Sequence, residues 1–237
     1  MVGLLALLVS FSAIASSAAE ASPSRRALTV HQTETPVFPY RLRELGLQEG
    51  DARVLIEVDE TGKLVDWLVI AYSHRLFAES AVQALKKWTF EPAMIDGQPV
   101  TTQIEVKFYY QENGIGFVTV DMETHLQARF NQVEDYRPCT LRELDRIPTP
   151  VATAAPFYSP AMAAKGARGA VRVEFYIDEN GAVKMPSVPQ TEFPELAAAA
   201  VNAVRQWRFE PPTRHGRPVL VKARQVFNFA PDGKTAP

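Results

Sequence analysis

The 237-residue sequence contains one cysteine, Cys139, so it cannot form an intramolecular disulfide. A fold stapled by disulfides is therefore excluded. We expect Cys139 to serve as a small, partly buried apolar residue rather than as a reactive thiol. The histidines are also few, and His31, His74, His125 and His215 lack the spacing of metal ligands. The sequence thus predicts no metal site.

Recognisable catalytic motifs are missing as well. The sequence has no Gly-rich phosphate loop, no nucleophile elbow and no paired His/Glu motif. The acidic pairs Asp59-Glu60 and Asp178-Glu179 fall where turns are expected, a position that favours acidic residues for conformational reasons. We therefore expect neither an enzyme nor a cofactor. The net charge of −2 gives no overall basic field for nucleic acid.

The first residues, 1–19, contain no charged side chain. They are apolar and small, and Ser17-Ala18-Ala19 suits cleavage by a signal peptidase. A spanning helix needs about 20 apolar residues, which is more than this run offers. We interpret residues 1–21 as a secretory signal peptide. The alternative is an uncleaved anchor.

One short stretch occurs twice, 119 positions apart, and includes a Trp/Phe pair, a proline and a following glycine. The residues involved are Trp88, Phe90, Pro92 and Gly97 in the first copy and Trp207, Phe209, Pro211 and Gly216 in the second. Around them, 62 positions align without a gap and 19 are identical. Turn residues and proline stops stay in register, so we infer an internal duplication.

Each copy has a strand–strand–helix–strand pattern. Alternating apolar residues, an acidic turn and a second apolar run predict a hairpin, and an Ala/Val-rich amphipathic run predicts a helix. We assign the first repeat to residues 36–110 and the second repeat to residues 156–230. Between them, residues 111–155 are expected to form a helical linker, with its helix over 121–135.

Each repeat resembles the TonB C-terminal domain. The second copy carries the resemblance in Tyr158, Pro160 and Gly166, in the run from Gly169 to Gly181, and from Ala200 through Val219. The resemblance implies an α+β fold with two domains, each a three-stranded antiparallel sheet with packed helices. It also implies a protein of the cell envelope that binds segments of partner proteins by adding them as a strand to its sheet.

Three functions remain open at this point. The first is a periplasmic protein that binds TonB-dependent outer-membrane receptors or other envelope proteins and takes part in transport across the outer membrane. The second is a structural scaffold whose domains pair with each other or in a homodimer. The third is an energy transducer anchored in the inner membrane by its first residues. For the third, only residues 22–35 precede the first repeat as a spacer.

The third strand of each repeat is the predicted binding edge, because residues 101–109 and 220–229 contain no proline. We expect the second repeat to be the main binder, since Lys222 and Arg224 on its third strand would favour a peptide with acidic residues. The predicted peptide-binding residues are Val219, Val221, Lys222, Ala223, Arg224 and Val226. Replacement of Ala223 by proline is expected to remove a backbone donor. The second strand, with Pro186 and Pro189, is predicted to be an edge strand.

Overall fold

The computed structural model describes residues 24–111, 114–119, 136–189 and 193–230. The predicted signal peptide and the helix predicted over 121–135 lie outside these residues. Within the described ranges, no helix is long and apolar enough to cross a membrane.

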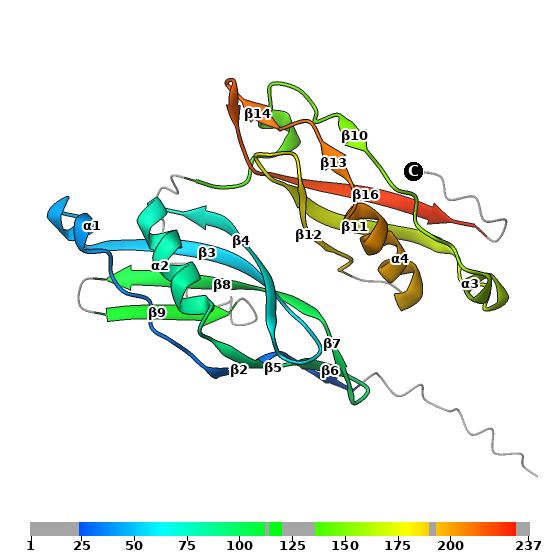
Figure 1. Ribbon diagram of the computed structural model, residues 1–237, viewed down its shortest axis with the longest axis horizontal. Helices are drawn as coiled ribbons and strands as arrows, with labels where there is room; N and C mark the ends of the chain where they lie inside the picture. The colour runs from blue at the N-terminus through cyan, green and yellow to red at the C-terminus, as the bar shows by residue number, and fades with distance from the viewer. Residues whose placement is uncertain (1–23, 112–113, 120–135, 190–192, 231–237) are drawn as a thin grey trace, which may run out of the picture.

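The first repeat is built on an antiparallel sheet with the strand order β4-β3-β8-β9 (Figure 1). A short helix precedes the sheet and a longer helix follows its second strand. The bounds are α1 (Tyr40–Glu44), β3 (Glu49–Val58), β4 (Leu64–Tyr72), α2 (Arg75–Leu85), β8 (Thr102–Gln111) and β9 (Gly114–Thr119). Short pairings flank it: β1 (Arg25–Arg26), β2 (Thr29–Gln32), β5 (Thr89–Glu91), β6 (Ala93–Ile95) and β7 (Gln98–Val100).

The second repeat has the strand order β12-β11-β16 and repeats the same sequence of elements. Its main elements are α3 (Pro160–Ala164), β11 (Gly169–Ile177), β12 (Val183–Ser187), α4 (Pro194–Val204) and β16 (Val221–Phe229). Smaller elements are the 3-10 turn η3 (Leu141–Glu143), β10 (Pro150–Ala152), β13 (Arg208–Phe209), β14 (Thr213–Arg214) and β15 (Arg217–Pro218).

The predicted α+β fold is correct, but the expectation of three strands in each sheet holds only for the second repeat. The first sheet gains β9, which comes from residues predicted to belong to a helical linker. Gln111 pairs with Gly114, so only two residues separate β8 from β9. The Asn113-Gly114 dipeptide at this point favours a tight hairpin and could have revealed this strand.

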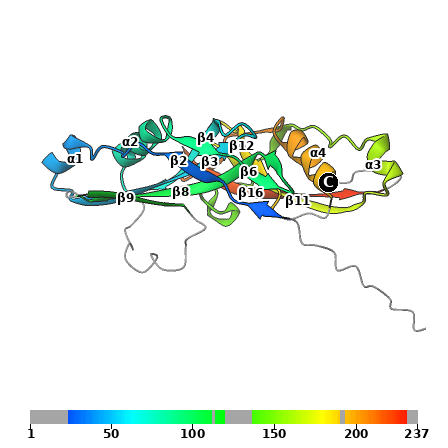
Figure 2. The same cartoon turned by 90° about the horizontal axis from the view of Figure 1, so that it is seen from below.

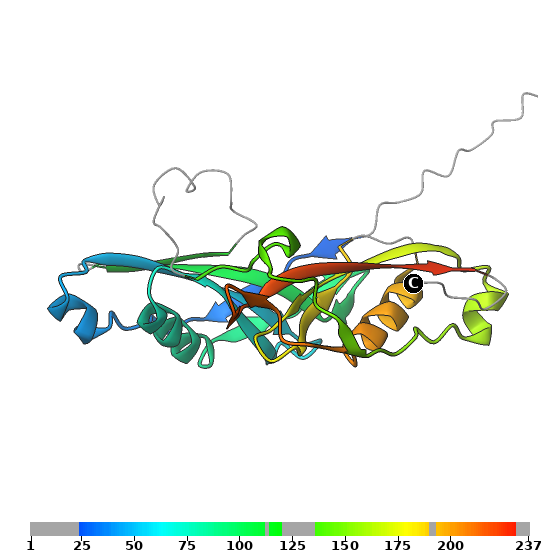
Figure 3. The ribbon, with the colours of Figure 1, turned by 90° about the horizontal axis from the view of Figure 1, so that it is seen from above.

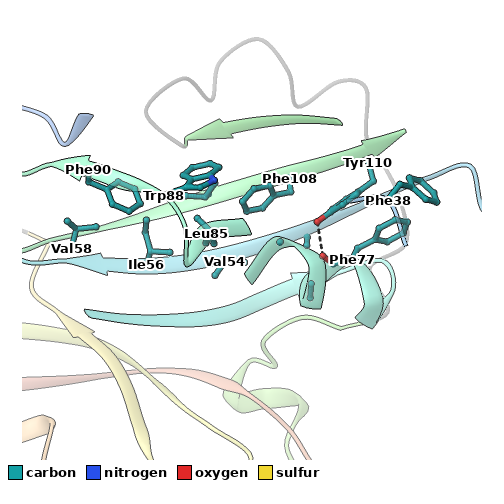
Figure 4. Packing of buried hydrophobic residues seen from close by; sticks show 14 of the residues in the cluster. Phe38, Val54, Ile56, Val58, Phe77, Leu85, Trp88, Phe90, Phe108 and Tyr110 are labelled. Carbon is teal, nitrogen blue, oxygen red and sulfur yellow. Dashed lines mark hydrogen bonds between the residues drawn. The ribbon is translucent and has the colours of Figure 1, made fainter. Parts of the chain in front are cut away.

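Two hydrophobic cores form, one in each repeat. Trp88 belongs to the first cluster and Trp207 to the second, and both are buried. Figure 4 shows the first core, where the hydroxyl of Tyr110 donates a 2.8 Å hydrogen bond to the carbonyl oxygen of Phe77. Burial raises the pKa of Tyr110 well above its ordinary value, so this hydroxyl stays neutral and keeps its donor. The repeated Trp motif therefore anchors two separate cores.

The hairpin turn of each repeat packs against the repeated Trp/Phe motif. Gly181 has φ +80°, and its carbonyl oxygen accepts a 2.8 Å hydrogen bond from the backbone N–H of Phe209. A Cβ at Gly181 would lie 1.9 Å from the carbonyl oxygen of Phe209, and one at Gly62 would lie 2.3 Å from that of Phe90. The turn glycines are thus required both by the left-handed backbone and by close packing.

The helices of both repeats lie on the same side of the two sheets, as Figures 2 and 3 show. In the second repeat, α4 packs on β11 and β12, and its buried face presents Leu196, Ala200 and Val204. The helix therefore covers one half of the sheet. The half nearer β16 is covered by Trp207, by Phe209 and by the chain that precedes the repeat.

Candidate functional site

The candidate site is the outer edge of β16. In the sheet order β12-β11-β16, this strand has a partner on one side only within the described part of the chain (Figure 1). Its beginning is covered by Cys139: the Cys139 N–H donates to the Leu220 carbonyl at 2.8 Å, and the Lys222 N–H donates to the Cys139 carbonyl at 3.3 Å. Cys139 is buried, as expected for a small apolar residue.

These two hydrogen bonds fix which backbone groups of β16 point outward. Backbone groups of successive strand residues point to opposite sides, so Lys222 sets the alternation for the whole strand. Arg224, Val226 and Asn228 therefore direct their N–H and C=O groups away from β11. Among the described residues, no backbone partner is found for these three amides. Together they form the open edge, the name used below for the outward groups of residues 224, 226 and 228.

The same alternation corrects the expected effect of proline at Ala223. Ala223 pairs with Phe175 in β11, and its backbone points inward. Proline at Ala223 would break the sheet rather than remove a donor from its edge. The position that tests the edge is Val226, whose side chain is exposed. The Val226 carbonyl accepts a 3.0 Å hydrogen bond from the side chain of Gln225, which an added strand would displace.

The other predicted binding residues lie in three different environments. Val219 precedes β16 and its N–H already donates to the carbonyl of Pro212 at 2.9 Å. Val221 is buried and pairs with Ile177. Lys222 forms an ion pair with Glu174 at 2.9 Å, which raises the pKa of Lys222. Of the two cations proposed to attract a peptide, Lys222 is therefore already engaged, which leaves the exposed Arg224.

The corresponding edge of the first repeat is closed. The repeat alignment places Lys107 opposite Val226 and Tyr109 opposite Asn228. In the structure Lys107 pairs with Val118 of β9, and Tyr109 pairs with Gly116. The chain thus adds its own strand at the edge that remains open in the second repeat.

The opposite edge of the second sheet is β12, as predicted from its prolines. This edge faces the first repeat. Lys184 lies 3.8 Å from Asp66 of β4, and the Pro186 carbonyl accepts a 3.3 Å hydrogen bond from Gln103. The inward-facing edges are therefore used between the repeats, and β16 is left on the far side of the second sheet.

An ion pair between the exposed Arg205 and the buried Glu57 joins the two repeats. The Arg205 guanidinium donates to both carboxylate oxygens of Glu57 at 2.9 Å, and Gln103 donates to the same carboxylate at 2.7 Å. Glu57 is only 5% exposed, so its charge depends on these partners. The sequence offered no signal for this pair, whose members lie 148 positions apart.

Tyr136 forms a second link between the repeats. Its backbone pairs with Tyr72 of the first repeat, and the two rings stack 4.8 Å apart. Its hydroxyl donates to Glu179 in the hairpin turn of the second repeat at 2.5 Å. Burial and the neighbouring Glu179 raise the pKa of Tyr136, so the hydroxyl remains a donor. The backbone and ring of Tyr136 thus contact the first repeat while its hydroxyl contacts the second.

Within the described residues, no three His, Cys, Asp or Glu side chains lie together in a way that could hold a metal ion. The open edge itself offers only backbone donors and acceptors. Such an edge can bind an extended polypeptide.

Comparison with known proteins assigns both repeats to one family. The family model for the Gram-negative bacterial TonB protein C-terminal matches twice, at residues 34–111 and 154–231. Protein TonB of Pseudomonas aeruginosa is 30% identical over 79 residues, which cover 33% of this chain. The matched stretch covers 23% of that relative, so the chain is similar to a limited part of it. The chain belongs to the TonB C-terminal family and carries two copies of its domain in tandem.

Proposed function

We propose that this chain is a non-enzymatic periplasmic protein that binds an extended segment of another envelope protein by adding it as a strand to β16. Its partners would be TonB-dependent outer-membrane receptors or other envelope proteins, and its role would lie in transport across the outer membrane. The observation that carries this proposal is the contrast between the two repeats. One edge is closed by β9, and in the part of the chain that the structure describes the equivalent edge is open.

Exposed strand edges are aggregation hazards, and proteins blunt or cover them when they have no use. Here the edge of β16 contains no proline, and its free part spans three outward residues. Each backbone hydrogen bond to a partner strand would add affinity without demanding a particular sequence. The exposed Arg224 would favour an acidic residue in the partner.

The links between the repeats support a role for the tandem as one body. With Glu57 bound to Arg205 and Tyr136 bridging both repeats, the first repeat would hold the second in a fixed orientation. A scaffold role, with a second copy of the chain at the same edge, is the alternative outcome of the test below.

The test uses the full chain and a synthetic peptide that copies an extended, periplasm-exposed segment of an outer-membrane receptor. We expect Val226→Pro to weaken peptide binding at least about tenfold, because proline removes an outward N–H and its ring obstructs the edge. The matched control is Val226→Thr, which keeps the outward N–H and a side chain of similar shape, and which should leave peptide affinity nearly unchanged. Equal binding by wild type and Val226→Pro would refute the proposal, and a peptide-independent dimer lost in Val226→Pro would favour the scaffold.

A further inference from the structure

A cavity of about 530 Å³ lies beside the open edge, on the helix side of the second sheet. The sheet contributes Ala223, Gln225 and Phe227, and the floor contains Trp207 and Phe209. The opposite wall is the chain that leads into the repeat, from Ile147 to Pro156. The lining is almost entirely apolar. Arg224 is also among the lining residues, so the cavity extends to the open edge.

The wall is held in place by two contacts with the repeated motif. The indole N–H of Trp207 donates to the carbonyl of Ala154 at 2.8 Å. Strand β10 pairs with β13, which places Pro150 opposite Phe209. The cavity is therefore bounded by paired backbone and a buried tryptophan, and its shape is fixed before any ligand arrives.

The first repeat explains why a hollow is left here. The alignment places Ile104 opposite Ala223 and Val106 opposite Gln225. Ile104 packs against the first core, and Val106 is fully buried. The second repeat thus has a smaller side chain at one core-facing position and a polar one at the next.

Resting on the proposed function, we infer that this cavity is a specificity pocket for one large apolar side chain of the bound segment. Side chains of an added strand would alternate between the two faces of the sheet. Those on the helix side, next to Ala223 and Gln225, would lie over the cavity, while those on the other side would lie near Arg224. The ligand is therefore an extended segment with a leucine-like residue flanked by polar or acidic ones.

A second copy of the chain fits this position less well than a different protein. Antiparallel pairing of β16 with itself, centred on Val226, would place each Arg224 opposite Asn228 of the other copy, so neither Arg224 would gain an acidic partner. The side chains next to the cavity would be Phe227 and Phe229 of the other copy, which are already buried in their own core. In a different protein, an apolar side chain can fill the cavity while an acidic neighbour pairs with Arg224.

The first experiment replaces each apolar residue of the receptor-segment peptide by alanine and measures binding to the full chain. We expect one replacement to weaken binding by about 10- to 100-fold, the loss that an unburied leucine-sized side chain produces. Ala223→Ile places in the second repeat the residue that the first repeat has at this position. This variant should bind the parent peptide more weakly, and it should bind the parent peptide and the weakened alanine-substituted peptide with equal affinity. If Val226→Pro removes binding while the alanine scan and Ala223→Ile have no effect, the pocket is refuted and the proposed function stands.

The second experiment needs no external ligand. A hairpin turn and a fourth strand are inserted into the full chain directly after Phe229. The residue of this added strand that lies opposite Ala223 is leucine in one form and alanine in the other. We expect the leucine form to melt about 2–4 °C higher than the alanine form. In an Ala223→Ile background the two forms should melt together. Equal melting of both forms in the wild-type background would overturn the inference, whatever the peptide does.

Discussion

Arg205, at the end of α4 in the second repeat, donates two 2.9 Å hydrogen bonds to the carboxylate of Glu57 in β3 of the first repeat. This pair lies between two hydrophobic cores that share no residue. The repeats are therefore distinct in their cores and are joined by this ion pair and by the contacts of Tyr136.

Removal of Arg205 tests that link. In Arg205→Met, Glu57 stays buried and loses its cationic partner. We therefore expect the free energy of unfolding to fall by about 1–3 kcal/mol and the two repeats to unfold less cooperatively. Urea denaturation followed by tryptophan fluorescence measures both. Arg172→Met, at an exposed position of β11, is the matched control and should change little. A single unchanged transition in Arg205→Met would show that the pair does not couple the repeats.

The two motif tryptophans give a prediction about the cores. Trp88 donates its indole N–H to the Glu34 carbonyl at 2.9 Å, as Trp207 does to Ala154. Truncation of either to alanine should cost about 3–5 kcal/mol, because a large buried ring and its hydrogen bond are both lost. The control is Trp67→Ala, which should cost far less because Trp67 is 37% exposed. Melting curves that place all three variants together would contradict the core assignment.

The turn glycines give a prediction with an internal control. Gly216 has φ +71°, and a Cβ at this position would meet no atom within 4 Å, so alanine there should cost only the left-handed backbone, about 1–2 kcal/mol. Alanine at Gly181 has the same backbone cost and must also displace the Phe209 carbonyl, which adds about 1–3 kcal/mol. Thermal denaturation of both variants compares them directly. If Gly216→Ala were the less stable of the two, the close packing of the turn would be wrong.

Glu143 predicts a pH dependence in the segment that leads to the cavity. Its hydrogen bond with Arg137, with further ones from Thr140, lowers the pKa of Glu143 from 4.5 to about 2. A lowered pKa means that the contribution to stability is present above pH 4.5 and is lost as the pH falls through about 2. NMR titration of the side-chain carboxyl should show this midpoint, and Arg137→Gln should move it upward. A wild-type midpoint near 4.5 would show that the contact does not form in solution.

The duplication made much of the fold predictable. The alternation in β3 and β11, the acidic turns and the Trp-x-Phe-x-Pro motif are local signals, and local signals survive in a single sequence. The composition of residues 111–155 predicts a linker and not β9, although Asn113-Gly114 favours a hairpin. That strand decides which repeat has the open edge.

The binding edge was predicted only in part. The sequence indicated β16 and its cations, but not which backbone groups point outward. That depends on the contact between Cys139 and Lys222, across 83 positions of the chain. The cavity and the Glu57–Arg205 pair likewise arise from tertiary packing, so the hydrophobic periodicity of the sequence does not predict them.

Amide hydrogen exchange of the full chain, with and without the receptor-segment peptide, tests the central claim most directly. In the free protein we predict fast exchange for the amides of Arg224, Val226 and Asn228, and slow exchange for Lys107, which is covered by β9. On addition of the peptide, the three edge amides should become protected while Lys107 stays unchanged. If they are already protected in the free protein, or if the peptide protects none of them, β16 is not an open edge that accepts a strand.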